Sequence, residues 1–223
     1  MPEIAIYDMD RTITRSGTYT PWLVFYAWHR APWRLLLLPV AALAGLAYGL
    51  KLITRKRVKE INQWLLLGPA VDRARLTPMA EAYARRILET NVYPDALAQI
   101  ASDKAAGRRV VLATASHRYY VDAIAKRLGV ADVIATGSIW DARDRLTWRI
   151  EGDNCYGAGK LGLVEAWFKA QRIARSKVRV RFYSDHASDL PVFDWSDEPY
   201  AVNASQKLRD IARERGWPTI DWS

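Results

Sequence analysis

The chain has 223 residues, half of them hydrophobic and 26% charged, which is typical of a globular protein with one sizeable domain or a core domain carrying an insert. A single cysteine, Cys155, excludes an internal disulfide and indicates a reduced, cytoplasmic compartment. The net charge of +9 favours anionic partners, and the first residues, MPEIAIYDMD, lack the basic and apolar regions of a signal peptide.

The first predicted element is a short buried strand over residues 3–8, EIAIYD, which ends at Asp8. Residues 13–90 then carry apolar residues at helical spacing and predict a largely helical segment. We expect a break near Gly68-Pro69 and a last helix over residues 78–90.

The positive charge is concentrated in this helical segment. No acidic residue lies between Asp10 and Glu60, and the rest of the chain is balanced in charge. The basic residues of that interval are Arg11, Arg15, Arg30, Arg34, Lys51, Arg55, Lys56, Arg57 and Lys59. They bracket an apolar run over residues 35–53, so anionic membrane lipid is the favoured partner. No nucleic acid is expected, and a solvated basic face is the alternative.

After the helical segment, strands and helices alternate. The predicted helices cover residues 94–107, 119–128, 160–173 and 205–215. The predicted strands cover residues 108–114, 132–136, 178–185 and 199–203, and a β-hairpin is predicted over residues 138–152 with its turn at 141–145.

This alternation predicts an α/β fold with a Rossmann-like parallel sheet covered by helices on both faces. Residues 1–12 and 91–223 are expected to form the core, and residues 13–90 a helical cap inserted after the first strand. Asp8, Thr114 and Asp185 all fall at the carboxyl ends of predicted strands, which is where parallel sheets place their functional sites.

Four short motifs occur in a defined order: DMDRT (8–12), VVLATAS (110–116), GAGKLG (157–162) and SDHASD (184–189). A lone D-x-D pair is weak evidence of catalysis, but together the four resemble the haloacid dehalogenase superfamily over essentially the whole chain. The position of the helical insert resembles the phosphoserine-phosphatase-like branch. The apolar, basic cap is similar to the phosphatidylglycerophosphatases of the C type.

The resemblance implies an Mg²⁺-dependent phosphatase of phosphomonoesters. Asp8 would be the nucleophile that forms an aspartyl-phosphate, and Asp10 the general acid and then base, a task that favours a raised pKa. Asp8, the backbone carbonyl of Asp10 and Asp185 would hold Mg²⁺, with Asp189 orienting metal-bound waters or binding the metal. Thr114 and Lys160 would hold the transferred phosphoryl oxygens.

Four further residues are predicted on the substrate side: Arg11, Thr12, Ser116 and His117. Arg11 stands where the superfamily commonly has glycine, and it either adds phosphate affinity or reflects a backbone that needs no positive φ there. Each motif residue also has a structural alternative. Lys160 could open a surface helix, Asp189 could cap a short helix toward Phe193, and His117 could be a solvated loop residue.

The apolar run raises a question of membrane topology. A single crossing would separate Asp8 from Thr114, Lys160 and Asp185, and no second segment is long enough to return the chain. The run is therefore expected to be an interfacial or re-entrant helical element, with Pro39, Gly45 or Gly49 as break points, or part of a wholly soluble cap.

Three functions follow from these observations. The first is hydrolysis of a lipid-borne or amphiphilic phosphate at the cytoplasmic membrane face. The second is hydrolysis of a small soluble metabolite. Within that class phosphoserine is disfavoured, because the cap has no early acidic residue to receive an ammonium group. The third is a non-catalytic lipid-binding regulator, against which the presence of every catalytic position argues.

Overall fold

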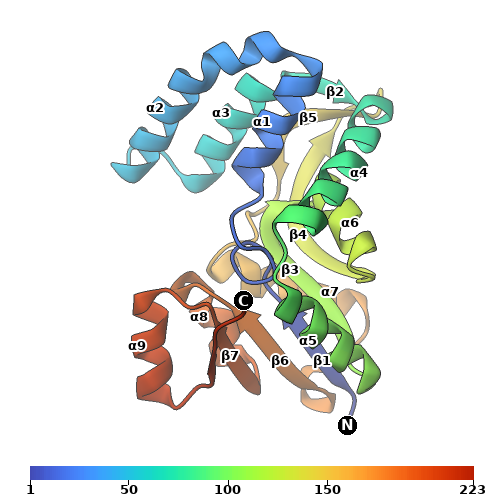
Figure 1. Ribbon diagram of the computed structural model, residues 1–223, viewed down its shortest axis with the longest axis vertical. Coiled ribbons are helices and arrows are strands. Elements are labelled where there is room, and N and C mark those ends of the chain that lie inside the picture. Colours follow the sequence, from blue (N-terminus) through green and yellow to red (C-terminus); the bar gives the residue numbers. More distant parts are fainter.

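The computed structural model describes residues 1–223 and contains one eight-stranded sheet in the order β2-β5-β4-β3-β1-β6-β7-β8 (Figure 1). The strands are β1 (Glu3–Tyr7), β2 (Ala70–Asp72), β3 (Arg109–His117), β4 (Asp132–Trp140), β5 (Arg145–Glu151), β6 (Arg179–Ser184), β7 (Glu198–Val202) and β8 (Thr219–Ile220). The six adjacent strands β4-β3-β1-β6-β7-β8 pair in parallel. At the other edge of the sheet, β5 pairs antiparallel with β4, and β2 pairs antiparallel with β5. The predicted α/β fold with a parallel sheet is confirmed.

The helices are α1 (Tyr19–Arg30), α2 (Leu38–Gly49), α3 (Arg55–Leu66), α4 (Arg73–Thr90), α5 (Pro94–Ala105), α6 (Arg118–Arg127), α7 (Ala158–Ala170), α8 (Leu190–Trp195) and α9 (Gln206–Arg215). Three short 3₁₀ helices are η1 (Pro32–Leu37), η2 (Arg175–Lys177) and η3 (Ala187–Asp189).

Side chains on the two faces of the sheet enter two separate hydrophobic clusters. Along β1, Ala5 and Tyr7 join one cluster with residues of α4, α5 and α6, while Ile4 and Ile6 join the other with residues of α7, α8 and α9. Successive strand residues point to opposite faces, so a strand that is buried on both faces is apolar throughout. This is why EIAIY shows no polar alternation.

The segment over residues 13–90 is largely helical, as predicted, and it also contains one short strand. Helices α1, α2 and α3 form the outer part of the cap, and β2 lies between α3 and α4. Helix α4 begins at Arg73, five residues before the predicted start, and contains Pro78. Helix α3 is tied to the hairpin strand β5, because Gln63 donates to the Thr147 carbonyl (3.0 Å) and Glu60 accepts from the Ile150 amide (3.2 Å).

Two strand predictions were too short. Strand β3 does not stop at Thr114 but continues to His117 after a shift of register against β4. Strand β4 is a single strand over both the predicted strand 132–136 and the first arm of the predicted hairpin. Its first part pairs with β3 in the core and its last part with β5, so one strand connects the core to the cap.

The apolar run forms η1 and α2. Pro39 lies in the first turn of α2, where the missing backbone N–H of proline costs no helical hydrogen bond. Of the two glycines, Gly49 ends the helix, whereas α2 continues through Gly45. The segment Pro32–Gly49 is long and apolar enough to cross a membrane by these two criteria alone, and 6% of it is buried.

Candidate active site

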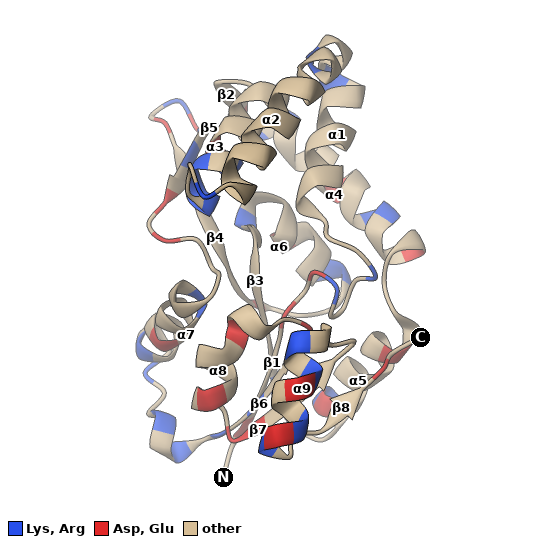
Figure 2. Cartoon of the chain, turned by 90° about the vertical axis from the view of Figure 1, so that its left-hand side faces the viewer, with Lys and Arg blue, Asp and Glu red and all other residues tan.

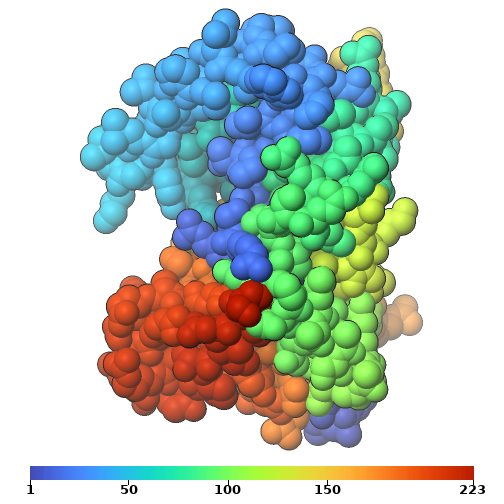
Figure 3. Space-filling view, in the orientation of Figure 1, coloured from blue at the N-terminus to red at the C-terminus, as the bar shows by residue number.

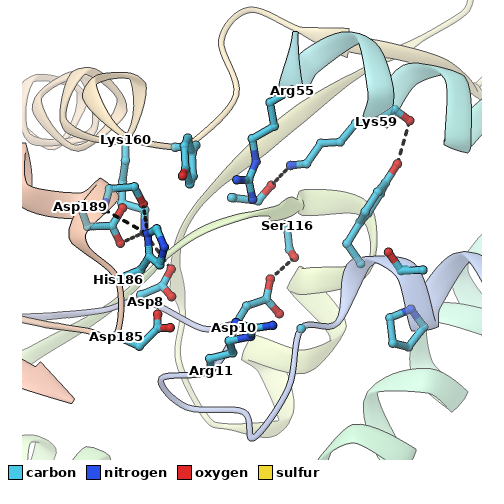
Figure 4. A pocket seen from close by; sticks show the side chains of 17 residues that line it. Asp8, Asp10, Arg11, Arg55, Lys59, Ser116, Lys160, Asp185, His186 and Asp189 are labelled. Atoms are coloured by element: carbon cyan, nitrogen blue, oxygen red, sulfur yellow. Dashed lines mark hydrogen bonds and ion pairs between the residues drawn. The ribbon is translucent and has the colours of Figure 1, made fainter. Parts of the chain in front are cut away.

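A cavity of about 530 Å³ opens between the cap and the carboxyl ends of the central strands (Figures 3 and 4). Only three of its seventeen lining residues are hydrophobic. The lining residues are Asp8, Asp10, Arg11, Gly17, Tyr19, Thr20, Pro21, Arg55, Lys59, Ala115, Ser116, Tyr156, Lys160, Asp185, His186, Ser188 and Asp189. The cavity therefore suits a polar, charged molecule.

The fold brings residues of all four motifs together at this cavity through elements distant in sequence. Asp8 directly follows β1, and Asp185 directly follows the neighbouring strand β6. Lys160 lies in the first turn of α7, where Gly159 is needed because a Cβ there would lie 2.7 Å from the Asn154 carbonyl oxygen. Lys160 is 2% exposed, so it does not open a surface helix.

Lys160 joins two buried carboxylates. Its Nζ lies 2.8 Å from Asp8 Oδ1 and 2.6 Å from Asp189 Oδ2. Burial alone would favour the neutral amine, but the two carboxylates outweigh it and raise the pKa of Lys160 above its usual range. Burial also raises the pKa of Asp8 to about 8, against the opposing effect of Lys160. The site thus holds a permanent cation beside a carboxylate that is poorly solvated.

Asp189 does not cap α8 with its side chain. It occupies the N-cap position, yet Oδ2 accepts hydrogen bonds from Lys160 and from Ser184 Oγ (2.7 Å), and no capping bond is made. Oδ1 is buried and has no hydrogen-bond partner. A buried carboxylate oxygen without a donor indicates a site for a cation or an ordered water.

Asp10 is fixed by two hydroxyl groups and one amide. Its Oδ1 accepts from the Thr18 amide and Thr18 Oγ1, both at 2.7 Å, and its Oδ2 accepts from Ser116 Oγ at 2.7 Å. Ser116 thus lines the cavity as predicted and also orients Asp10. Thr18 was missed by the sequence analysis because it lies eight residues from Asp10, outside any recognisable motif.

Thr12 and Thr114 lie beneath the cavity, outside its lining. Thr12 Oγ1 lies 3.4 Å from both Asp8 Oδ2 and Asp185 Oδ1, so it can orient either carboxylate. Thr114 Oγ1 accepts from the Ser116 amide at 3.1 Å and is fully buried. In this conformation Thr114 therefore shapes the backbone turn after its strand.

Arg11 has a left-handed backbone with a φ of 66°. The site therefore does require positive φ at this position, and the alternative that the backbone has no such need is wrong. A non-glycine residue in this region is strained by about 1–2 kcal/mol. In return, Arg11 adds a cation to the cavity lining.

His117 is placed away from the cavity, which contradicts its expected role as a substrate contact or solvated residue. It is fully buried, its Nδ1 lies 3.0 Å from Ser138 Oγ, and its ring packs beside Tyr19 and Tyr119. Burial, and then the nearby Lys59 charge, lower the pKa of His117 well below its usual range. His186 is exposed and lines the cavity, and its Nδ1 accepts from the Ser188 amide at 3.1 Å.

The cap contributes two cations that face Asp10 and Arg11 across the cavity (Figure 4). Arg55 and Lys59 are one turn apart on α3, and the Arg55 guanidinium stacks 3.8 Å from the centre of the Tyr156 ring. Lys59 Nζ donates to the Ala115 carbonyl (2.6 Å) and to Asn154 Oδ1 (2.7 Å). Burial, and then the charge of Arg55, lower the pKa of Lys59 to about 7. The sequence signal for this pair was the i, i+4 spacing of Arg55 and Lys59 in a segment without acidic residues, which places both on one face of a helix.

The donor set fits the predicted Mg²⁺ ion. Mg²⁺ prefers oxygen ligands, keeps several of its waters and takes one or two carboxylates from a protein. Asp8 and Asp185, which Thr12 connects, provide two carboxylates, and the Asp10 carbonyl is the predicted third ligand. Burial, and then the Asp189 charge, raise the pKa of Asp185 to about 6. No group of three acidic, histidine or cysteine side chains forms a ready-made cluster, so the fit relies on two carboxylates and a backbone oxygen.

Comparisons with known proteins show the family and the fold. The family model of the haloacid dehalogenase-like hydrolases matches residues 5–194. A protein of unknown function from Bordetella pertussis has a similar structure, with a TM-score of 0.91 and 27% identity over 99% of both chains. A substrate-bound phosphoserine phosphatase complex shares the fold, with a TM-score of 0.65 and 16% identity over 99% of this chain and 93% of that one.

Curated relatives match either the whole chain or about half of it. The inhibition of morphological differentiation protein of Streptomyces azureus is 28% identical over 98% of this chain and 78% of its own length. A phosphoserine phosphatase of Mycobacterium tuberculosis is 34% identical over 52% of this chain and 37% of its own, and a histidinol-phosphatase of Neisseria meningitidis is 25% identical over 55% and 56%. The chain thus spans only about a third to a half of those two enzymes. With the family model covering most of its length, the chain belongs to the haloacid dehalogenase-like hydrolases.

Proposed function

We propose that this protein is a phosphatase, which hydrolyses an anionic, amphiphilic phosphomonoester with the help of Mg²⁺ and through a phosphorylated Asp8. One observation carries the proposal. The buried Asp8 carboxylate faces a polar cavity, with Lys160 Nζ at 2.8 Å and with Asp10 fixed nearby by Ser116 and Thr18.

Asp8 is the proposed nucleophile. Its Oδ2 has only the long contact to Thr12 and is the oxygen left to attack, because Oδ1 is held by Lys160. The phosphorus–oxygen bond to Asp8 forms as the bond to the leaving alkoxide breaks, and water later cleaves the aspartyl-phosphate. The Lys160 charge lowers the repulsion between this carboxylate and the incoming dianion.

Asp10 is the proposed general acid and base. A protonated Asp10 gives its proton to the leaving oxygen, and the resulting carboxylate then accepts a proton from the attacking water. The hydrogen bonds from Thr18 and Ser116 hold its carboxyl group in one orientation for both steps. Mg²⁺ bound by Asp8, Asp185 and the Asp10 carbonyl would neutralise charge on the phosphoryl oxygens.

The cap wall supports a substrate with a second negative charge on its leaving group. Arg55 and Lys59 line the side of the cavity formed by the cap, and no acidic residue of the cap reaches it. A phosphodiester or carboxylate near the scissile phosphate would pair with these cations, whereas an ammonium group would be repelled. A phosphatidylglycerophosphate-like lipid has this arrangement and would present its headgroup at the cytoplasmic face of the membrane.

A small soluble metabolite is the second candidate, because the lining is polar and requires no lipid chain within the cavity. Phosphoserine remains disfavoured within this class because its ammonium group would meet the cationic cap wall with no cap carboxylate to receive it. The two candidate substrates differ beyond the second negative group: the lipid continues into hydrocarbon chains, whereas the metabolite has none.

A substrate panel tests the proposal. Purified protein with Mg²⁺ is assayed against p-nitrophenyl phosphate, phosphoserine, lysophosphatidate and phosphatidylglycerophosphate. We expect the highest kcat/KM with a doubly anionic lipid phosphate. Arg55→Gln should raise KM for such substrates by about tenfold while leaving p-nitrophenyl phosphate within about twofold. Equal losses on all substrates, or a preference for phosphoserine, would contradict the proposed substrate.

A further inference from the structure

The η1–α2 segment exposes most of the large apolar side chains found at the surface of this protein. Nine of the fourteen exposed large hydrophobic residues lie within residues 33–52, and we call them the η1–α2 surface. They are Trp33, Leu36, Leu38, Val40, Leu43, Leu46, Tyr48, Leu50 and Leu52. Leu36, Leu43 and Leu52 are 81%, 64% and 72% exposed. A patch of this size on a monomer marks an interaction surface.

Helix α2 is apolar on all sides, yet it packs against little more than α3 and η1. Its sequence, LPVAALAGLAYG, contains no charged residue, and Ala41 is its only buried residue. Figure 1 shows α2 on the outer edge of the cap, and Figure 2 shows it free of charge beside the basic start of α3. An apolar helix exposed in this way needs an apolar environment on its open side.

The charge around the η1–α2 surface identifies that environment. Arg30 and Arg34 flank one end, Lys51 and Arg57 lie at the other, and no acidic residue occurs from residue 11 to residue 59. A second copy of the chain would bring like charges together across a symmetric interface, which is unfavourable. An anionic bilayer offers both an apolar interior and a negative surface, and Trp28, Trp33 and Tyr48 add the aromatic groups that favour its interface.

The dimensions indicate contact with one leaflet. Helix α2 has 12 residues and is about 18 Å long, whereas the hydrocarbon core of a bilayer is about 30 Å thick. Both of its ends return to elements of the folded cap. The loop after α2 leads directly to Arg55, which lines the cavity, so the exposed apolar surface adjoins the cavity on the cap side.

We infer that the η1–α2 surface docks this protein on an anionic lipid bilayer, with α2 lying in the headgroup region and the cavity mouth held close to the lipid headgroups. The biological purpose of this docking, access to an amphiphilic phosphomonoester, rests on the proposed function. The binding itself requires no catalysis, so it can be tested separately.

Flotation with vesicles tests the docking. The full chain is mixed with vesicles of phosphatidylglycerol and phosphatidylcholine, or of phosphatidylcholine alone, without substrate. We expect binding to the anionic vesicles that weakens with salt. Leu43→Glu with Leu46→Glu should reduce it by at least about tenfold. Arg30→Gln and Lys51→Gln should each reduce it about fivefold, because both side chains are exposed and available to the lipid headgroups.

Leu97→Glu is the matched control, since Leu97 is an exposed leucine (42%) on the core helix α5. It should bind vesicles as the unchanged protein does, and all variants should keep their p-nitrophenyl phosphate hydrolysis. Three results would overturn the docking: no binding to anionic vesicles, an equal loss in Leu97→Glu, or a stable dimer that Leu43→Glu dissociates. An inactive protein that still floats with vesicles would contradict the proposed function and leave the docking standing.

Discussion

The ammonium group of Lys59, on cap helix α3, lies 2.6 Å from the carbonyl oxygen of Ala115, the residue after Thr114. This contact joins the cap to the strand end that borders the cavity. Ala115 lies where β3 shifts register against β4, and its carbonyl accepts from Lys59 and from Thr136 Oγ1 (2.7 Å) on β4. A cap cation thus stabilises the turn that presents Ser116 to Asp10.

The lowered pKa of Lys59 predicts a pH-dependent contribution to stability. The unfolded chain holds the Lys59 proton up to about pH 10.5, whereas the folded chain releases it near pH 7. Between these values the unfolded state binds more protons, so the free energy of unfolding rises with pH, by at most about 1.4 kcal/mol per pH unit from this group. Denaturant titrations from pH 7 to 9.5 should show the unchanged protein gaining stability relative to Lys59→Met. A constant difference between the two would contradict the buried placement of Lys59.

Replacing the predicted nucleophile should abolish turnover without unfolding the protein. Asp8→Asn keeps the shape of the side chain but removes the attacking charge, and Lys160 keeps its partner Asp189. We expect kcat to fall by about 10³-fold or more. Steady-state assays should compare it with Asp194→Asn, a matched change at a carboxylate on α8 that pairs with Arg215 at the surface. Similar losses in both variants would indicate a general effect on folding.

The role of Asp10 predicts a dependence on the leaving group. An alkoxide needs a proton as it departs, whereas p-nitrophenolate leaves readily without one. Asp10→Asn should therefore reduce kcat for an alkyl phosphate by about 10²–10⁴-fold, and less for the first step with p-nitrophenyl phosphate. Rapid-mixing kinetics separate that first step from hydrolysis of the intermediate. Equal losses of the first step for both substrates would argue against proton donation by Asp10.

Replacing Asp185 should have opposite effects on the stability of the metal-free protein and on its affinity for Mg²⁺. Its folded pKa of about 6 lies above the unfolded value of 3.8, so its ionised form costs stability above about pH 6. In a chelator at pH 7.5, Asp185→Asn should be more stable than the unchanged protein by about 1–3 kcal/mol. It should also bind Mg²⁺ at least about tenfold more weakly. Thermal unfolding with and without Mg²⁺ measures both effects, and an unaltered response to Mg²⁺ would exclude Asp185 as a ligand.

Arg11 allows side-chain and backbone effects to be separated. Arg11→Ala and Arg11→Gly both remove the cation from the cavity, so both should raise KM for the phosphomonoester by a similar factor. Only glycine relaxes the backbone at a φ of 66°, so Arg11→Gly should be the more stable of the two by about 1 kcal/mol. Equal stability in denaturant would show that this backbone is not strained.

The sequence predicts the parts of the site that depend on strand order. Asp8 and Asp185 follow apolar strands that are neighbours in the sheet, so periodicity and motif order were sufficient to bring them together. The prediction failed where the structure depends on tertiary pairing. The side chain of His117 points to a buried face because β3 continues past its register shift against β4. Strand β2 forms because the edge of β5 is available for pairing. Neither a shifted register nor an available strand edge leaves a local pattern in the sequence.

Strand β4 has a consequence for how quickly the enzyme can turn over. One uninterrupted strand pairs with β3 at its start and with β5 at its end, and β5 is in turn tied to α3 by Gln63 and Glu60. The cap therefore cannot swing away as a separate body without breaking this ladder. Entry of substrate and release of phosphate must use short-range flexing of the loops at residues 8–18 and 50–54. We expect turnover to be governed by chemistry or phosphate escape, with no slow hinge rotation in the cycle.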